Sequence, residues 1–256
     1  MAPLNIATAL YNDNFCVLVH DSEHQLTVSI DAPDTNTILN LLRNKGWSLT
    51  HIFNTHHHSD HTRSNLELKK IFNCSISGPL IESHKIPGID HGLSDRRILN
   101  FGQHPVEIIS TPGHTLGHIC YHFLEDHLLF SGDTLFSLGC GRIFEGTSSV
   151  MFESLQKIAS MPDKTFIYFG HEYTYNNARF ALLYDPHNEE LQQYFSKIKY
   201  LEENKYYTCP TILSLEKKTN PFLRTSDVVL RKNLFMEDAS DLAIFSALRS
   251  RKDLFK

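Results

Sequence analysis

The sequence predicts an α/β fold in its first two-thirds, followed by a small helical C-terminal domain. Apolar, β-rich runs alternate with segments of helical periodicity up to about residue 172, and the strand signals fade after it. Several strand-like runs end in a short polar loop that carries histidine or aspartate. Loops on a rigid scaffold are where functional residues are expected, so we expect these loops to meet at one edge of a sheet sandwich.

Seven β-rich runs predict strands, at 15–19, 27–30, 49–54, 106–110, 119–123, 127–130 and 165–169. Helical periodicity predicts helices at 35–45, 65–72 and 151–161. Thr35 is a candidate cap for the first helix, and Gly46 stands where a terminating glycine is expected. These elements form the first predicted domain, residues 1–172.

The remaining residues, 173–256, predict a second domain made of helices. Segments 173–184, 188–204 and 239–253 have helical patterns, and Pro210 and Pro221 interrupt the stretch between the last two. In the last helix the apolar residues fall on one face, which is typical of packing against a neighbouring layer.

Composition limits the function classes. The chain has 256 residues and a net charge of −5, which argues against a nucleic-acid partner because phosphates require a basic face. No apolar run is long enough to span a bilayer and no signal peptide is evident, so we expect no membrane partner. Five cysteines without a C-x-x-C pair indicate free thiols in a reducing compartment, the cytoplasm. We expect a monomer, since no long exposed apolar stripe requires a partner.

The most informative segment is the run from Thr55 to His61, which places three histidines and one aspartate in a H-x-H-x-D-H pattern after a predicted strand. Its chemically important members are His56, His58, Asp60 and His61. Imidazole and carboxylate ligands suit zinc, iron or manganese. Such clustering has no packing rationale, so the run predicts a metal site. His57 and Ser59 alternate with the ligands and are expected to point away.

Three further motifs complete the predicted site. His114 lies in a Pro-Gly turn, and Asp133 and His171 each follow a strand. Taken singly, each is more typical of a structural residue, but together with the histidine run they become candidate ligands. We predict one ion held by His56, His58 and His114, and a second held by Asp60, His61 and His171. Asp133 bridges the two ions.

Two residues have supporting or open roles. Asp31 follows a predicted strand and can orient a ligand histidine. His118 can either support the site through hydrogen bonds or bind metal, with support favoured over ligation.

These motifs resemble those of the metallo-β-lactamase superfamily and, within it, the glyoxalase II (hydroxyacylglutathione hydrolase) family. The resemblance covers nearly the whole chain. It rests on Asp31, the H-x-H-x-D-H run, His114, Asp133 and His171, with supporting stretches at 111–115, 130–136, 139–142, 145–147, 170–174, 220–224 and 251–256.

The resemblance implies an αββα sandwich followed by a helical domain, and hydrolysis of a glutathione thioester, chiefly S-D-lactoylglutathione, which detoxifies methylglyoxal. The implied glutathione-binding residues are Arg142, Tyr173, Arg249 and Lys252. Members of that family often carry Lys and Tyr where this chain has Arg142 and Phe144. Loss of that hydroxyl donor is expected to weaken glutathione binding by about 0.5–1.5 kcal/mol.

The mechanism that follows uses two divalent ions, with zinc as the first candidate and iron or manganese as alternatives. A hydroxide that bridges the ions attacks the thioester carbonyl, with Asp133 and Asp60 as the catalytic carboxylates and Asp60 also a candidate proton acceptor. One alternative is a persulfide dioxygenase with a single iron ion. A non-catalytic metal-binding module and a nuclease are further alternatives, the nuclease being disfavoured by the acidic balance.

Overall fold

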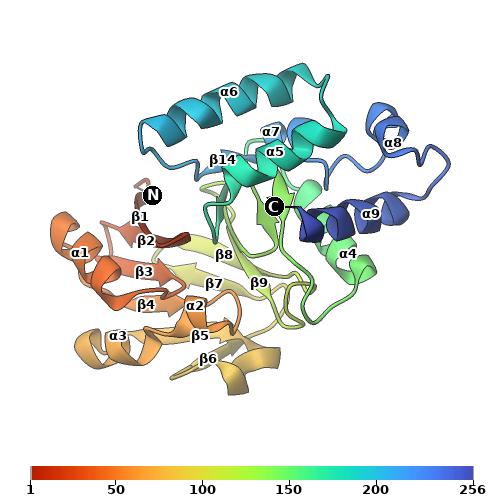
Figure 1. The fold of residues 1–256 in the computed structure, drawn as a ribbon. Coiled ribbons are helices and arrows are strands. Elements are labelled where there is room, and N and C mark those ends of the chain that lie inside the picture. The colour runs from red at the N-terminus through yellow and green to blue at the C-terminus, as the bar shows by residue number, and fades with distance from the viewer. Residues whose placement is uncertain (1, 256) are drawn as a thin grey trace.

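Two six-stranded sheets face each other at the centre of the fold, with helices on both outer faces (Figure 1). The structure is a computed structural model and describes residues 2–255. The first sheet contains β1 (Asn5–Tyr11), β2 (Asn14–Asp21), β3 (Leu26–Ile30), β4 (His51–Phe53), β5 (Ser75–Pro79) and β6 (His91–Leu93), in that order. The fold is therefore the expected αββα sandwich.

The second sheet has the order β14-β13-β10-β9-β8-β7. Its strands are β7 (Ile98–Phe101), β8 (His104–Ser110), β9 (Ile119–Phe123), β10 (Leu128–Gly132), β13 (Phe166–Phe169) and β14 (Thr211–Ile212). A short hairpin of β11 (Leu135–Phe136) and β12 (Gly139–Cys140) stands apart from both sheets.

The helices are α1 (Thr35–Lys45), α2 (Ser59–Thr62), α3 (Asn65–Phe72), α4 (Ser148–Ala159), α5 (Thr174–Tyr184), α6 (Glu189–Glu203), α7 (Leu213–Thr219), α8 (Val228–Leu234) and α9 (Asp241–Leu254). One 3₁₀ helix, η1, spans Leu80–Lys85. In the part of the chain from 2 to 255, no helix has both the length and the apolar character needed to cross a membrane.

Three apolar layers hold the sandwich together. Between the sheets, residues such as Val17 and Phe53 pack against Phe101 and Phe130. The outer face of the first sheet packs on α1 and α3, and the outer face of the second packs on α4 and the C-terminal helices. Because both faces of each sheet are covered, strands such as β2 are buried at every position.

The seven predicted strands and the helices α1, α3, α4, α5, α6 and α9 are all present, with ends shifted by a few residues. The expectation that Thr35 caps α1 is wrong, because the Asp34 carboxylate accepts the hydrogen bond from the Thr37 amide. Gly46 ends the helix with φ of 70°, as predicted. Strand β5 escaped prediction because its sequence, SISGP, has low strand propensity, and pairing with β4 and β6 imposes the strand.

The C-terminal part is helical apart from β14, which pairs antiparallel with β13 and so extends the second sheet. Its side chains also share one apolar cluster with that sheet, in which Phe222 and Phe245 lie with Leu129 and Ile167. The division of the chain at residue 172 stays a prediction.

Strand direction brings the polar loops together. Strands β3 and β4 run parallel in the first sheet, and β10 and β13 run parallel in the second. Parallel strands deliver their carboxyl ends to the same edge, and Asp31, His56, Asp133 and His171 each follow one of these strands. The four loops therefore meet at one edge of the sandwich, as the sequence indicated.

Candidate metal centre and adjoining pocket

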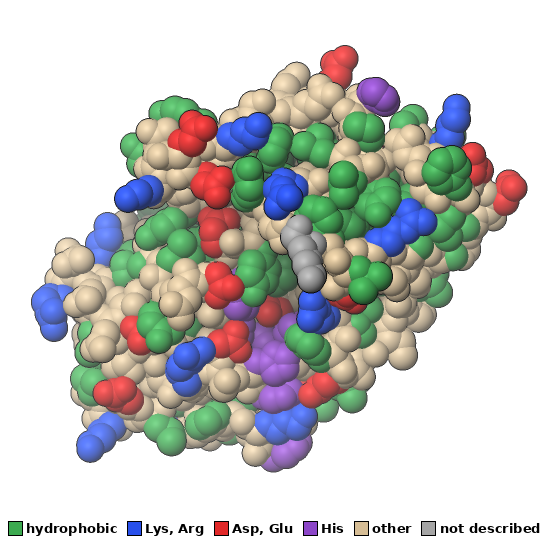
Figure 2. Space-filling view, viewed as in Figure 1, with side chains coloured by type: hydrophobic (Ala, Val, Ile, Leu, Met, Phe, Trp, Pro, Cys, Tyr) green, Lys and Arg blue, Asp and Glu red, His purple; other side chains and the backbone are tan. Residues whose placement is uncertain are grey.

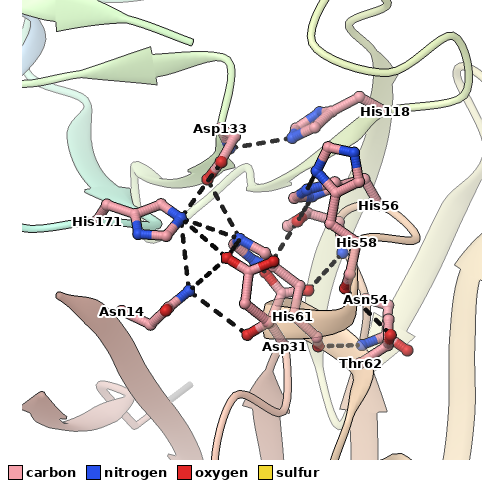
Figure 3. A network of polar contacts seen from close by, with 12 residues as sticks. Asn14, Asp31, Asn54, His56, His58, His61, Thr62, His118, Asp133 and His171 are labelled. Atoms are coloured by element: carbon pink, nitrogen blue, oxygen red, sulfur yellow. Dashed lines mark hydrogen bonds and ion pairs between the residues drawn. The ribbon is translucent and has the colours of Figure 1, made fainter. Parts of the chain in front are cut away.

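The histidine run spans the loop after β4 and the start of α2, which contains Asp60 and His61, and its side chains converge with those of other loops (Figure 3). On one side of the centre, Nδ1 of His58 lies 3.1 Å from Nε2 of His56 and 3.0 Å from Nε2 of His114. These three nitrogen atoms form the first group of candidate ligands.

On the other side, Nε2 of His61 lies 3.3 Å from Nε2 of His171. The Asp60 carboxylate lies 3.6 Å from the first and 3.5 Å from the second of these nitrogens. Asp133 stands between the two groups, with one oxygen 3.3 Å from His114 and 3.4 Å from His171, and the other 3.4 Å from His61. The structure thus brings the seven candidate ligands together, and their assignment to two ions stays a prediction.

Partners outside the centre fix the imidazole rings. Nδ1 of His61 lies 2.8 Å from Asp31, whose carboxylate also accepts hydrogen bonds from the amide and hydroxyl of Thr55. Nδ1 of His114 donates to the carbonyl of Arg142 at 2.8 Å. Such contacts place the proton on the outer nitrogen and leave Nε2 free to bind a metal ion. Asp31 therefore has the orienting role expected for it.

His118 supports the centre from behind. Its Nε2 accepts the amide hydrogen of Asp133 at 3.1 Å, and its Nδ1 lies 2.9 Å from the Thr111 hydroxyl. Both ring nitrogens are therefore occupied, so the structure favours the supporting role over ligation for His118.

Electrostatics differ between the two sides. Burial, followed by the neighbouring imidazoles, lowers the pKa of His56 well below its usual value, and burial also lowers the pKa of His58 and His114. Burial opposes protonation of His61 as well, but the carboxylates of Asp133 and Asp31 raise its pKa to about 9. Burial raises the pKa of Asp133, and the surrounding imidazoles, His171 first, outweigh it and hold that pKa below its usual range.

This donor set fits divalent transition metals. Ring nitrogens face one another at hydrogen-bond distance in both groups, and one buried oxygen of Asp133 has no hydrogen-bond partner among residues 2–255. A buried carboxylate oxygen without a partner is costly, and a cation between these groups would satisfy it together with the lone pairs of the imidazoles. The cluster is able to bind metal ions.

The centre opens into a pocket of about 510 Å³, within the size range of small-molecule sites. Figure 2 shows histidine side chains in a hollow on this face, with Lys and Arg side chains nearby. The pocket is lined on one side by His58, Asp60, His114, Asp133 and His171, and on the other by the side chains of α9 and the loop after β12.

All four residues assigned to glutathione by resemblance line this pocket: Arg142, Tyr173, Arg249 and Lys252. The Tyr173 ring stacks on His171, with centroids 4.8 Å apart. Arg249 is only 6% exposed, and its guanidinium donates to the Cys140 carbonyl and to Asp253. Arg249 thus anchors the chain around the pocket as well as lining it.

Phe144 forms one wall beside the first ligand group. Its ring centroid lies 5.2 Å from that of His114 and 5.8 Å from that of His58, while 60% of the residue is exposed. The Arg142 guanidinium lies 5.9 Å from the same ring. The wall is therefore apolar where a tyrosine would offer a hydroxyl.

Sequence reasoning missed Asp13, in the turn between β1 and β2, and Asn14, the first residue of β2. The Asn14 amide donates to the Asp60 carboxylate at 3.2 Å and lies 3.4 Å from Nε2 of His171. Asp13 lies 3.5 Å from Nδ1 of His171. A turn with Asp and Asn has no distinctive spacing, so only the tertiary structure identifies these two contacts.

Two protein-family models match the chain, one over its first part and one over its last part. Residues 22–171 match the model of the metallo-beta-lactamase superfamily, which is the class that the sandwich and the histidine-rich edge define. Residues 172–255 match the model described as the hydroxyacylglutathione hydrolase C-terminus. The chain belongs to the hydroxyacylglutathione hydrolase family.

Relatives with this name cover all or nearly all of the chain. A hydroxyacylglutathione hydrolase of Rhizobium johnstonii is 52% identical over 256 residues, which is 100% of both chains. The enzyme of Brucella ovis is 49% identical over 244 residues, 95% of each chain. Both carry the same name, so the family assignment does not depend on one relative.

Solved structures support the fold alone. ETHE1 from Myxococcus xanthus matches with a TM-score of 0.65 and 20% identity, covering 100% of both chains. A di-iron-bound form of TTHA1623 matches with a TM-score of 0.62 and 23% identity over 86% of this chain and 100% of that one.

Proposed function

We propose that this chain hydrolyses the thioester of 2-hydroxyacylglutathiones, chiefly S-D-lactoylglutathione, to the hydroxy acid and glutathione. This reaction would complete the detoxification of methylglyoxal. The observation that carries the proposal is a single pocket in which a cluster of five histidines and two aspartates meets cationic side chains of α9. Membership of the hydroxyacylglutathione hydrolase family supports the same activity.

We propose two divalent metal ions per chain, zinc being the first candidate and iron or manganese the alternatives. His56, His58 and His114 would hold one ion, Asp60, His61 and His171 the other, and Asp133 both. When bound, such ions supply Lewis-acid polarisation of the carbonyl and lower the pKa of water to about 7. No serine or cysteine nucleophile is then required.

Residues around the centre would hold the metal ligands and a candidate proton acceptor in place. Asp31 holds His61, and the Arg142 carbonyl holds His114, so the ligand nitrogens keep their direction during turnover. Asp60 is partly exposed to the pocket and kept in place by Asn14, so it is the candidate acceptor for the proton of the attacking water. The Phe144 and Tyr173 rings line the same pocket.

The glutathione part would lie toward α9. Glutathione has two carboxylates, which pair well with guanidinium and ammonium groups. Arg142 and Lys252 are the two cationic residues of the pocket that keep accessible surface, whereas Arg249 is buried and largely committed to the Cys140 carbonyl and Asp253. We propose that Arg142 and Lys252 contact the carboxylates of glutathione and that Tyr173 contacts its peptide groups. Arg249 would add positive charge to the pocket and hold α9 in position beside it.

The persulfide dioxygenase alternative is less well supported, because Asp60, His61 and His171 form a complete second group of candidate ligands. One assay separates the possibilities: loss of thioester absorbance with S-D-lactoylglutathione, with and without a chelator, alongside metal analysis. Hydrolysis that is abolished by chelation and restored by metal is expected. Oxygen consumption with glutathione persulfide and no thioester hydrolysis would refute the proposal, and tight metal uptake without either activity would indicate a binding module.

We also propose that the protein acts as a monomer in the cytoplasm. Five free, buried cysteines support a reducing compartment. Light scattering after size exclusion would test the monomer, because a dimer would double the mass of 29.4 kDa expected from the chain.

A further inference from the structure

His57, which lies between His56 and His58 in the run, faces a second group of polar side chains behind the metal centre. Its Nδ1 lies 2.9 Å from a carboxylate oxygen of Glu82, in η1. Its Nε2 lies 3.5 Å from the Glu145 carboxylate. The ring is therefore placed between two carboxylates from segments distant in sequence.

The same carboxylates hold the loop that carries His114 and His118. The other oxygen of Glu82 accepts the amide hydrogen of Gly117 at 2.7 Å. A Cβ atom at Gly117 would lie 2.4 Å from Cγ of Glu82, so the approach requires glycine. Glu145 accepts the amide hydrogen of Leu116 at 3.0 Å.

The Glu82 contact is buried, which makes its pairing important. Glu82 is 2% exposed, and among residues 2–255 neither its second oxygen nor Nδ1 of His57 has a hydrogen-bond partner of regular geometry. A buried carboxylate oxygen left unpaired is strongly destabilising. The two atoms are 2.9 Å apart, so a small rotation of the ring would direct a proton on Nδ1 at Glu82 and pair both atoms.

We propose that His57 is a positioning residue, which joins the histidine run to the loop of His114 through Glu82 and so fixes the first group of metal ligands. His58 follows His57 directly, and His114 lies three residues before Gly117. Rotation of either loop would therefore separate His58 from His114, whose ring nitrogens lie 3.0 Å apart. This inference rests on the proposed two-metal function.

A third metal ion is the competing explanation, since His57, Glu82 and Glu145 also form a possible ligand group. The Lys85 ammonium, 3.4 Å from the Glu145 carboxylate, opposes it because it already supplies a positive charge there.

The test measures Zn²⁺ binding by competition with a chromophoric chelator, together with zinc content and the thermal midpoint. In His57→Leu, one of two zinc equivalents is expected to bind about 10- to 100-fold more weakly, the usual effect of losing an outer partner of a metal ligand. In His57→Asn, the amide retains a donor near the position of Nδ1, so most of the affinity should return. A merely structural role would not produce this difference.

The matched control is His104→Leu, which removes a buried histidine paired with Asp126 at 2.8 Å in the second sheet. It should lower the thermal midpoint without changing zinc affinity. The inference would be overturned if His57→Leu bound zinc as the wild type does, or if it lost no more zinc affinity than His104→Leu. It would also be overturned if His57→Leu and His57→Asn lost equal zinc affinity, or if the wild type bound three ions. If the wild type still bound two zinc ions in these cases, the proposed hydrolase function would stand. A wild type that bound no zinc would overturn both the role of His57 and the proposed function.

Discussion

Asp133 is the residue on which the proposed two-ion site depends most, because its two oxygens face histidines of both ligand groups. We predict that Asp133→Asn retains the fold but binds about one equivalent of metal less. Turnover should fall by more than about 100-fold, since even outer partners of a ligand are worth 10- to 100-fold. Metal analysis and thioester hydrolysis measure both effects. Near-normal turnover with two ions bound would show that Asp133 does not bridge.

Phe144 offers a second prediction at the residue scale. Its ring stands beside His58 and His114, where a tyrosine could donate a hydrogen bond to bound glutathione. Phe144→Tyr is expected to lower KM for S-D-lactoylglutathione by about 2- to 10-fold with little change in kcat, which corresponds to one hydrogen bond. Phe166→Tyr, at an exposed phenylalanine of β13, serves as the control. An unchanged KM would place glutathione away from Phe144.

The proposed contact of Lys252 with glutathione would make substrate binding depend on pH. Burial, followed by repulsion from Arg249 and Arg179, lowers the pKa of Lys252 to about 8. The charged form, which pairs with a carboxylate, is therefore present below pH 8 and is lost as the pH rises through it. We predict that KM rises between about pH 7.5 and 9 in the wild type.

Lys252→Met, which lacks the titrating group, should show a higher KM with no rise over this range. Because a bound carboxylate favours the ammonium form, kcat should show its break at higher pH than kcat/KM. A pH-independent KM in the wild type would argue against a role for Lys252 in binding.

At the scale of elements, helix α9 is fastened to the β11–β12 hairpin by Arg249. Its guanidinium donates to the Cys140 carbonyl at 2.7 Å and to Asp253 at 2.9 Å, and lies over the Phe222 ring. A lysine ammonium cannot reproduce this planar set of contacts.

Arg249→Lys is therefore expected to destabilise the fold by about 2 kcal/mol, which lowers the thermal midpoint by roughly 4–8 °C in a chain of this size. Arg251→Lys, two residues further along α9, is the control and should change the midpoint little. Thermal unfolding followed by circular dichroism measures both. Equal midpoints for Arg249→Lys and the wild type would show that the buried guanidinium does not fasten the helix.

The elements themselves were predictable where local chemistry determines them. Helix α1 has helical periodicity and ends at Gly46, and both signals can be read directly from the sequence. Strands β5 and β14 were not predictable, because Ser, Gly and Pro in the first and the two-residue length of the second give no local signal. Pairing with neighbouring strands supplies what the local sequence lacks.

For the whole molecule, the C-terminal part and the sandwich share a core. Phe180, Phe222 and Phe245 lie in one buried cluster with Leu129 and Ile167 of the second sheet, and β14 covers the edge of β13. A chain ending at residue 172 would lack the three phenylalanines and would expose Leu129, Ile167 and an unpaired edge of β13.

We predict that this truncated chain fails to unfold cooperatively and binds the dye ANS, whereas the full chain does not. Circular dichroism and dye fluorescence provide the measurement. A cooperative transition at the midpoint of the full chain would show that residues 1–172 fold alone, as an independent first domain should.

The alternation of strands and helices and the candidate ligands could be predicted from local patterns, because metal-binding residue types at strand ends are recognisable. The side chains that stand behind those ligands became identifiable with the three-dimensional fold. Asn14, Glu82 and Glu145 contact the site or its supporting loops across 46, 35 and 29 residues of chain, respectively. Contacts over such separations depend on how the two sheets pack, and neighbouring residues carry no record of them.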